Sequence, residues 1–368
     1  MSAAALRVGL VGVGGVCSAV HYPGLSLIDG VEIAGICEPG DDLRQQRQRQ
    51  WGIDAAFAGI DDLLAEVAPD AVSIATPNVY HKELIFAALE AGCHVICEKP
   101  LGMDFAQTQE IYDRGKASGR RHMTAFTYRF VPAMNYIRHL VQSGALGSIR
   151  HARFQRLQDW GERAIGWRQY RDQAGSGELG DMGIHRLDFA EDLLGPIHAV
   201  CGHVKQLVPR DRTKEGAPCP PQDVEDWIAW IAEFASGTTG VFEMGKLAKG
   251  HGPGGDHDLA ELNGIEASAV YRLHAPHEIL FAPRGEPYRA RAVPEEFLKR
   301  PGAPRDPAVG DPIVTFRYDQ AWEFVSAIRA GRDCMPSFWH GMRAQAVADA
   351  ILEAAATRRW VDIPDCPV

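Results

Sequence analysis

Three residues of this 368-residue chain have the type and spacing to move a proton and to stabilise charge. Lys99 follows a short β-branched run and is flanked by Glu98 and Pro100, so we expect it at the carboxyl end of a strand. Open α/β sheets bind their ligands at that edge. Asp181 and His185 stand four residues apart, a spacing that places both side chains on one face of a helix. A histidine oriented by a carboxylate is a general acid or base whose ordinary pKa lies near neutral pH.

Both features also have a purely structural interpretation. A lysine at a strand end is most often a solvated charge. An aspartate in the first turn of a helix is favoured by the helix dipole, and a histidine one turn later can simply be hydrogen-bonded in place. Spacing alone does not decide between these interpretations, so the rest of the chain must.

Composition narrows the classes of partner. The formal net charge of -10 and the pI near 5.8 disfavour nucleic-acid and anionic-membrane partners, because neither attracts an acidic protein. No apolar stretch approaches the roughly 18 to 20 residues that span a bilayer, and Met1 to Ala5 lack the basic segment of a signal peptide. The eight scattered cysteines are typical of reduced, buried thiols. We expect a cytoplasmic protein with a small-molecule partner and no metal site.

A nucleotide-binding pattern opens the chain. The sequence predicts a strand at 6–11, a glycine-rich turn, a helix at 18–28 and a second strand at 31–37. Gly12 lets the chain turn tightly, and Gly14 lets the backbone approach a pyrophosphate at the helix N-terminus. Glu38, at the end of the second strand, can accept hydrogen bonds from an adenosine ribose diol, which favours NAD over NADP.

Arg44 and Arg47 leave NADP open as the cofactor, and Cys17 departs from the usual glycine turn. Arg44 and Arg47 lie on the next predicted helix, where they are solvated or can accept a 2′-phosphate. Cys17 stands where a third glycine or alanine normally allows close packing of helix on strand, which implies slightly looser packing there.

The order of the predicted elements indicates two domains. Strands expected at 71–76, 93–97 and 122–127 alternate with helices at 79–90 and 104–117, which predicts an α/β Rossmann domain with a doubly wound parallel sheet over residues 1–127. After a helix at 132–142, hairpins follow, with strands at 148–158, 224–234, 238–246, 259–262 and 265–273. Residues 128–368 should therefore form an α+β domain with a large, mainly antiparallel sheet. We expect another copy of the chain to cover the outer face of that sheet, with Trp227, Trp230 and Phe242 nearby, and so a homodimer or homotetramer.

Three local features of the second domain are also predicted. The last hairpin should turn at Asn263 and Gly264. The segment 250–258 contains His251, Asp256, His257 and Asp258, which could bind a metal or substrate but fit a polar surface loop better. The segment 281–312 is expected to be irregular.

In combination, the motifs resemble the Gfo/Idh/MocA oxidoreductases over nearly the whole chain. They are the Gly12-Val13-Gly14-Gly15 turn, Thr76-Pro77-Asn78 followed by His81, Glu98-Lys99-Pro100, Tyr128-Arg129-Phe130, and the series Gly177, Asp181, Gly183, His185 and Asp188. The resemblance implies an enzyme that uses NAD or NADP to oxidise or reduce a secondary alcohol of a sugar, cyclitol or related polyol or glycoside.

The resemblance also implies roles for individual residues. The catalytic residues would be Lys99, Asp181 and His185. Cofactor contacts would come from Gly12, Val13, Gly14, Gly15, Val16, Glu38, Thr76, Pro77, Asn78, His81, Glu98, Lys99, Trp167 and Arg168. We expect substrate contacts from Lys99, Tyr128, Arg129, Trp160, Arg163, Asp181 and His185, although 160–171 could also be a solvent-facing loop.

The chemistry suits these residues. Hydride leaves a carbinol carbon only if the hydroxyl proton is removed, so we expect His185 to be the base, Lys99 to stabilise negative charge on the oxygen, and Asp181 to position His185 or a neighbouring hydroxyl. The roles of Lys99 and His185 could be exchanged. Two other functions compete: an NAD-dependent glycosidase that works by transient oxidation and elimination, and a non-enzymatic sensor, which the presence of all three residues disfavours.

Overall fold

The computed structural model describes residues 4–161, 166–213, 216–252 and 257–366, and the chain divides into two compact units. The first unit comprises Met1–Thr127 and Lys299–Met342, and the second comprises Tyr128–Leu298 and Arg343–Val368. The chain changes unit after residue 127. The segment 299–342, which the sequence assigns to the second domain, groups instead with the first unit.

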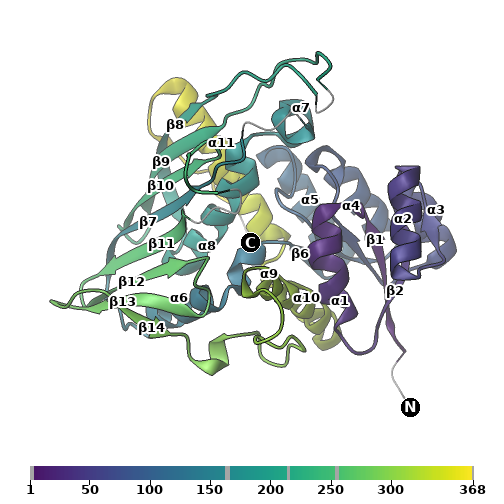
Figure 1. Cartoon of the computed structure of the whole chain (residues 1–368), viewed down its shortest axis with the longest axis horizontal. Coiled ribbons are helices and arrows are strands. Elements are labelled where there is room, and N and C mark those ends of the chain that lie inside the picture. The colour runs from purple at the N-terminus through teal and green to yellow at the C-terminus, as the bar shows by residue number, and fades with distance from the viewer. Residues whose placement is uncertain (1–3, 162–165, 214–215, 253–256, 367–368) are drawn as a thin grey trace. The chain divides into compact units, whose positions relative to one another are not determined.

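The first unit is built on a parallel sheet of six strands in the order β3-β2-β1-β4-β5-β6. Strands β1, β2 and β6 of this sheet are labelled in Figure 1. Its elements are β1 (Leu6–Val11), a π turn (Cys17–His21), α1 (Tyr22–Ser26), β2 (Val31–Cys37), α2 (Asp41–Trp51), β3 (Ala56–Phe57), α3 (Ile60–Val67), β4 (Ala71–Ile74), a 3-10 turn (Asn78–Tyr80), α4 (His81–Glu90), β5 (His94–Cys97), α5 (Phe105–Ser118), β6 (His122–Thr124), α9 (Pro312–Thr315), a 3-10 turn (Phe316–Tyr318) and α10 (Asp319–Ala330). The strand order reverses direction between β1 and β4, which is the point where doubly wound sheets bind ligands. The predicted Rossmann fold is confirmed.

Local sequence explains where these elements begin and end. Val8 and Leu10 of β1 are fully buried, as a central parallel strand covered on both faces requires. The Asp104 side chain accepts a hydrogen bond of 2.8 Å from the Gln107 amide and so caps α5. Gly119 ends the same helix with a φ of +67°, a conformation that favours glycine.

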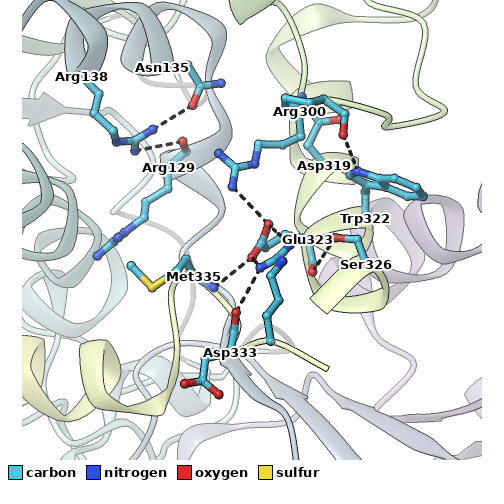
Figure 2. Close-up of polar contacts among 12 residues, drawn as sticks. Arg129, Asn135, Arg138, Arg300, Asp319, Trp322, Glu323, Ser326, Asp333 and Met335 are labelled. Carbon is cyan, nitrogen blue, oxygen red and sulfur yellow. Dashed lines mark hydrogen bonds and ion pairs between the residues drawn. The ribbon is translucent and has the colours of Figure 1, made fainter. Parts of the chain in front are cut away.

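Ion pairs to two buried carboxylates hold the segment 299–342 together. Glu323 of α10 accepts hydrogen bonds from the Arg300 guanidinium at 3.1 Å and the Met335 amide at 3.1 Å, and it also pairs with Arg332 (Figure 2). Asp319, one turn earlier, binds the Arg305 guanidinium through both oxygens at 2.8 and 2.9 Å. The paired residues stand 9 to 23 positions apart, so the spacing of a single helix does not predict these pairs.

The second unit contains a nine-stranded sheet in the order β14-β13-β12-β11-β7-β10-β9-β8-β15, and Figure 1 shows these strands following one another from β8 to β14. Its elements are α6 (Pro132–Gln142), β7 (Ile149–Leu157), a 3-10 turn (Trp167–Gln169), α7 (Arg171–Ala174), a π turn (Leu179–Gly183), α8 (Ile184–Leu194), β8 (Ile197–Lys205), β9 (Trp227–Phe234), β10 (Thr239–Gly245), β11 (His257–Gly264), β12 (Ala267–Arg272), β13 (Glu278–Pro283), β14 (Arg289–Ala292), a 3-10 turn (Glu295–Phe297), α11 (Phe338–Thr357) and β15 (Val361–Asp362). A further 3-10 turn, Thr127–Phe130, lies at the boundary of the units. All pairings in this sheet are antiparallel except β7 with β10, so the mainly antiparallel sheet is confirmed.

One face of this sheet is buried under helix α8. Phe154 of β7 lies 5.7 Å from Phe189 of α8 between ring centroids and stacks on Phe242, which in turn stacks on Trp230. Trp230 and Phe242 are therefore core residues and cannot contribute to a contact on the outer face, where the sequence analysis places them. Only Trp227 of the three is part-exposed.

Three predicted boundaries differ in the structure. Asn263 still pairs with Ser268, so the hairpin turns at residues 265 and 266, because the pairing continues past the Asn-Gly signal. His257 and Asp258 begin β11 instead of lying in a surface loop, whereas Asp256 lies outside the described residues. The segment 281–312 contains strand β14, which pairs with β13.

All eight cysteines are free thiols. Within the described part of the chain, no helix is long and apolar enough to cross a bilayer.

Candidate active site

The glycine turn after β1 leaves open space for a ligand. A Cβ on Gly12 would lie 2.7 Å from Thr76 Cγ2 and 2.8 Å from the Ala75 carbonyl oxygen, and the φ of Gly12 is +78°. Glycine is therefore required there. A Cβ on Gly14 or Gly15 would meet no atom within 4 Å. The open side of this turn, at the start of the following helical segment, fits the approach of a dinucleotide pyrophosphate to backbone amides.

The Glu38 carboxylate lies across this turn. Its Oε2 accepts a hydrogen bond from the Val13 amide at 3.3 Å, and its Oε1 accepts one from the Gly40 amide at 3.1 Å. Arg44 donates to the Glu38 carbonyl at 2.7 Å, and Arg47 donates to the Val13 carbonyl at 3.0 Å. Both arginines hold the backbone around Glu38 and so are more than a solvated helix face.

Two π turns among the described residues fall on the two segments that the sequence singles out. One is Cys17–His21, directly after the glycine turn, and the other is Leu179–Gly183, which contains Asp181. Such turns occur often at functional sites because they change the direction of side chains within a helix. Cys17 is fully buried, and burial raises the pKa of its thiol to about 12, so this residue is a packing group.

The Thr76-Pro77-Asn78 turn and His81 lie at the carboxyl end of β4. The His81 ring is fully buried, with Nδ1 2.8 Å from the Pro100 carbonyl oxygen and Nε2 3.1 Å from the Thr76 carbonyl oxygen. Both ring nitrogens therefore face protein groups. His81 ties the end of β4 to the turn after β5 and is better described as a positioning residue than as the direct cofactor contact the sequence analysis expects.

Glu98, next to Lys99, belongs to a hydrogen-bonded series that the sequence did not reveal. Glu98 Oε1 lies 2.9 Å from His21 Nε2, and His21 Nδ1 lies 2.8 Å from the Ser73 hydroxyl oxygen. Glu98 Oε2 also accepts from the Lys99 amide at 3.3 Å. His21 stands 77 positions before Glu98 in the sequence, so no spacing rule could have joined them.

In the second unit, Asp181 pairs with Arg168. Arg168 Nε lies 3.5 Å from Asp181 Oδ1, and the Arg168 guanidinium lies 4.2 Å from the centroid of the Trp167 ring. The pair is partly exposed, and both partners come from segments that sequence reasoning proposed for the site.

His185 follows one turn later, at the start of α8, and is almost fully buried. Its ring lies 4.6 Å from the Tyr128 ring between centroids, in an edge-on arrangement. The Arg186 guanidinium lies 4.7 Å from the centroid of the Tyr128 ring. Tyr128 is only 4% exposed, so it orients His185 by packing.

The structure changes the interpretation of Arg129. Its guanidinium forms two hydrogen bonds of 2.7 Å to Asp188 and a third of 2.9 Å to Asp192, and Arg138 also pairs with Asp192. Figure 2 shows Arg138 also bound to Asn135 and to the Arg129 carbonyl. Because its donors are engaged in this buried cluster, Arg129 holds α8 in place and is not a substrate contact.

The remaining expected substrate residues have different environments. Trp160 is half-buried, and the Lys246 ammonium lies 5.6 Å from the centroid of its ring. Arg163 lies outside the described residues. Asp258, proposed as a possible ligand, is buried between Arg156 and Arg186 and balances their charge.

A buried acid three residues before Asp181 was missed by sequence reasoning. Glu178 is fully buried, and neither carboxylate oxygen has a hydrogen-bond partner among the described residues. Burial and the negative charge of Asp181 raise the pKa of Glu178 to about 8. The Glu225 carboxylate takes the neighbouring amides instead, from Gly177 at 2.8 Å and Leu179 at 2.9 Å. A glutamate within a run of small residues was the only available signal.

Comparison with known proteins identifies the class. Residues 6–126 match the oxidoreductase family with an NAD-binding Rossmann fold, and residues 134–270 match the GFO/IDH/MocA C-terminal domain. Together with the fold and the nucleotide turn, these matches define an NAD-dependent oxidoreductase.

Individual relatives act on sugars. The levoglucosan dehydrogenase of Pseudarthrobacter phenanthrenivorans is 31% identical over 350 residues, which is 89% of each chain. The D-glucoside 3-dehydrogenase of Escherichia coli K12 is 33% identical over 64% of this chain and 69% of its own. A solved levoglucosan dehydrogenase, in complex with NADH and levoglucosan, superimposes with a TM-score of 0.89 at 30% identity and covers 98% of this chain and 100% of its own.

The chain belongs to the Gfo/Idh/MocA family of oxidoreductases. It is a dehydrogenase that uses NAD as cofactor and acts on sugar-type alcohols.

Proposed function

We propose that this enzyme oxidises a secondary ring hydroxyl of a neutral monosaccharide, anhydrosugar or glycoside. The observation that carries this proposal is the Arg168–Asp181 pair one helical turn before the buried His185, because it brings a carboxyl group and a histidine together on one helix for a hydroxyl group. Similarity along 89% of the chain to a levoglucosan dehydrogenase supports the substrate class.

NAD would be held by the open glycine turn and by the Glu38 carboxylate. When bound, NAD accepts the hydride from the carbinol carbon. Glu38 is placed for a ribose diol and would repel a 2′-phosphate, which supports NAD over NADP. Val13, Gly15 and Val16 would line the pyrophosphate, with Thr76, Pro77 and Asn78 at the end of the neighbouring strand.

The protein's own groups would handle the proton. His185 takes the hydroxyl proton as the carbinol carbon becomes a carbonyl, and Lys99 stabilises negative charge on the oxygen. Asp181, held by Arg168, fixes a neighbouring hydroxyl or the His185 ring. Trp167 and Trp160 offer aromatic faces to the apolar side of the sugar ring.

The test of this assignment combines two substitutions with a binding control. Lys99→Ala should reduce kcat by at least about 100-fold, as loss of one oxyanion-stabilising group does in other enzymes, while the Kd for NADH stays within about threefold of wild type. His185→Ala should flatten the low-pH limb of the rate profile. Unchanged turnover in Lys99→Ala removes the lysine from the mechanism, and a surviving low-pH limb places the base elsewhere.

Substrate identity requires a panel. Levoglucosan, alkyl glucosides, aldoses and inositols should be assayed with NAD and NADP in parallel at 340 nm. NADH formation with an anhydrosugar or glycoside supports the proposal. Release of free sugar from a glycoside without net NADH would instead select the glycosidase mechanism.

We also propose that a second copy of the chain covers the outer face of the nine-stranded sheet. Ile231 and Val241 are paired across β9 and β10 and are 42% and 44% exposed, so they form an apolar centre on that face. Light scattering should give a multiple of the 40.3 kDa chain mass, and Val241→Arg should lower it. A monomeric wild type at micromolar concentration defeats this proposal.

A further inference from the structure

Three side chains of the first unit form one line of hydrogen bonds that ends at Lys99. Ser73 of β4 lies 2.8 Å from His21 Nδ1, and His21 Nε2 lies 2.9 Å from Glu98 Oε1. Glu98 Oε2 accepts from the Lys99 amide at 3.3 Å. The line joins the π turn after the glycine loop to the carboxyl end of β5, the two segments expected to meet the cofactor.

Burial excludes two simpler roles for this line. Ser73 is fully buried within β4, so its hydroxyl cannot attack a substrate, and the Ser–His–Glu order is not a hydrolytic triad. His21 is 2% exposed and has both ring nitrogens bonded, so it cannot itself meet a cofactor or substrate. The Glu98 side chain is 13% exposed and is the only member of the three with appreciable access to a ligand.

We propose that His21 is a positioning residue, which holds the Glu98 carboxylate ionised and in one orientation beside Lys99. This inference rests on the proposed function, because Glu98 and Lys99 act there at the cofactor and the reacting hydroxyl. Without the bond from His21, the carboxylate would be able to rotate and to take up a proton in its partly buried position.

The electrostatics agree with this geometry. Burial by itself raises the pKa of Glu98, and the hydrogen bond and charge of His21, with the charge of Lys99, outweigh it, so that the pKa lies below its ordinary value. The titratable groups around Glu98 are Cys17 and His21 of the π turn, His81 of α4, and its chain neighbours Cys97 and Lys99. The His21 ring is hydrogen-bonded to the Glu98 carboxylate at 2.9 Å.

Loss of the hydrogen bond from His21 should move the acid limb of activity to higher pH. Glu98 is ionised in the wild type down to a lower pH than an ordinary glutamate. A variant without a donor at position 21 should protonate Glu98 at a higher pH, so activity and NADH binding should be lost earlier as the pH falls. Glutamine can still donate to the carboxylate, whereas leucine cannot.

The test compares His21→Leu with His21→Gln, each in the wild-type and the Glu98→Gln background. We expect His21→Leu to lower kcat/KM about 10-fold or more near neutral pH, the usual effect of losing a hydrogen bond to a charged group. Its acid limb should move up by about one pH unit, whereas His21→Gln should stay near wild type. In the Glu98→Gln background, His21→Leu should add no further loss.

A second readout separates this proposal from the proposed function. The Kd for NADH, measured by fluorescence across the same pH range, should show the same upward shift in His21→Leu and not in His21→Gln. If the wild type oxidises no sugar alcohol, the proposed function fails, and the NADH data still test His21. A lowered melting temperature with an unchanged pH profile, or an equal loss in the Glu98→Gln background, would overturn the role of His21. If His21→Leu does not fold, Ser73→Ala takes its place, because it removes the partner of His21 Nδ1. The acid limb should then move up in Ser73→Ala and stay near wild type in His21→Gln. An unshifted limb in Ser73→Ala, or a shifted limb in His21→Gln, overturns the role of His21.

Discussion

Replacing Glu178 by glutamine should make the stability of this protein less dependent on pH. In the folded state, burial and Asp181 raise the pKa of Glu178 from 4.5 to about 8. A raised pKa means that the folded chain holds this proton more tightly than the unfolded chain. The contribution of Glu178 to stability is therefore fully present below the unfolded pKa of about 4.5 and is lost as the pH rises through about 8.

The size of this effect follows from the shift. A rise from 4.5 to about 8 corresponds to a limit of about 5 kcal/mol, and relaxation around a buried ionised group should reduce this to about 2 to 3 kcal/mol. Glutamine has nearly the shape of the protonated acid and no such dependence. As the pH rises from about 5 to about 9, the unfolding free energy of Glu178→Gln should increase by about 2 kcal/mol or more relative to that of the wild type.

Urea unfolding at several pH values between these limits measures the difference directly. Glu66→Gln provides the control, since Glu66 is an exposed residue of α3. The control should follow the wild type at every pH. If Glu178→Gln also runs parallel to the wild type, Glu178 is not the buried, protonated acid inferred here.

Three further substitutions test the framework around the site. Gly12→Ala should unfold at a clearly lower temperature than the wild type, because the new Cβ would meet Thr76 and the Ala75 carbonyl. Gly14→Ala should keep the wild-type melting temperature, because a Cβ there meets no atom within 4 Å. Its affinity for NADH, measured by fluorescence titration, should fall about 10-fold or more. Arg129→Lys should cost about 2 kcal/mol in urea unfolding, because lysine cannot bind Asp188 with two parallel hydrogen bonds; wild-type stability would contradict the structural role assigned to it. Glu323→Gln should lower the free energy of unfolding by a similar amount, about 2 kcal/mol, because it removes the charge that faces Arg300 and Arg332. An unchanged unfolding curve would show that these pairs do not stabilise the segment 299–342.

Local sequence determined much of the fold. The strands at 6–11 and 31–37 and the helix at 132–142 have the predicted bounds because hydrophobic periodicity, glycine and proline act over a few residues. The nucleotide turn was predictable for the same reason, since Gly12 is required by its own backbone conformation. The proposal that Lys99, Asp181 and His185 are catalytic likewise comes from their type and spacing.

Only the tertiary structure decided which group pairs with each buried charged side chain. Arg129 belongs to the same motif as the proposed site residues, yet its guanidinium is engaged by Asp188 and Asp192, about 60 positions away. His21 is bonded to Glu98 across 77 positions, and Glu178 became a buried acid only when α8 and the strands enclosed it. The sequence by itself thus determined the elements and the candidate chemistry, which depend on near neighbours. The partner of each buried charged group depends on contacts between distant segments, and these exist only in the folded chain.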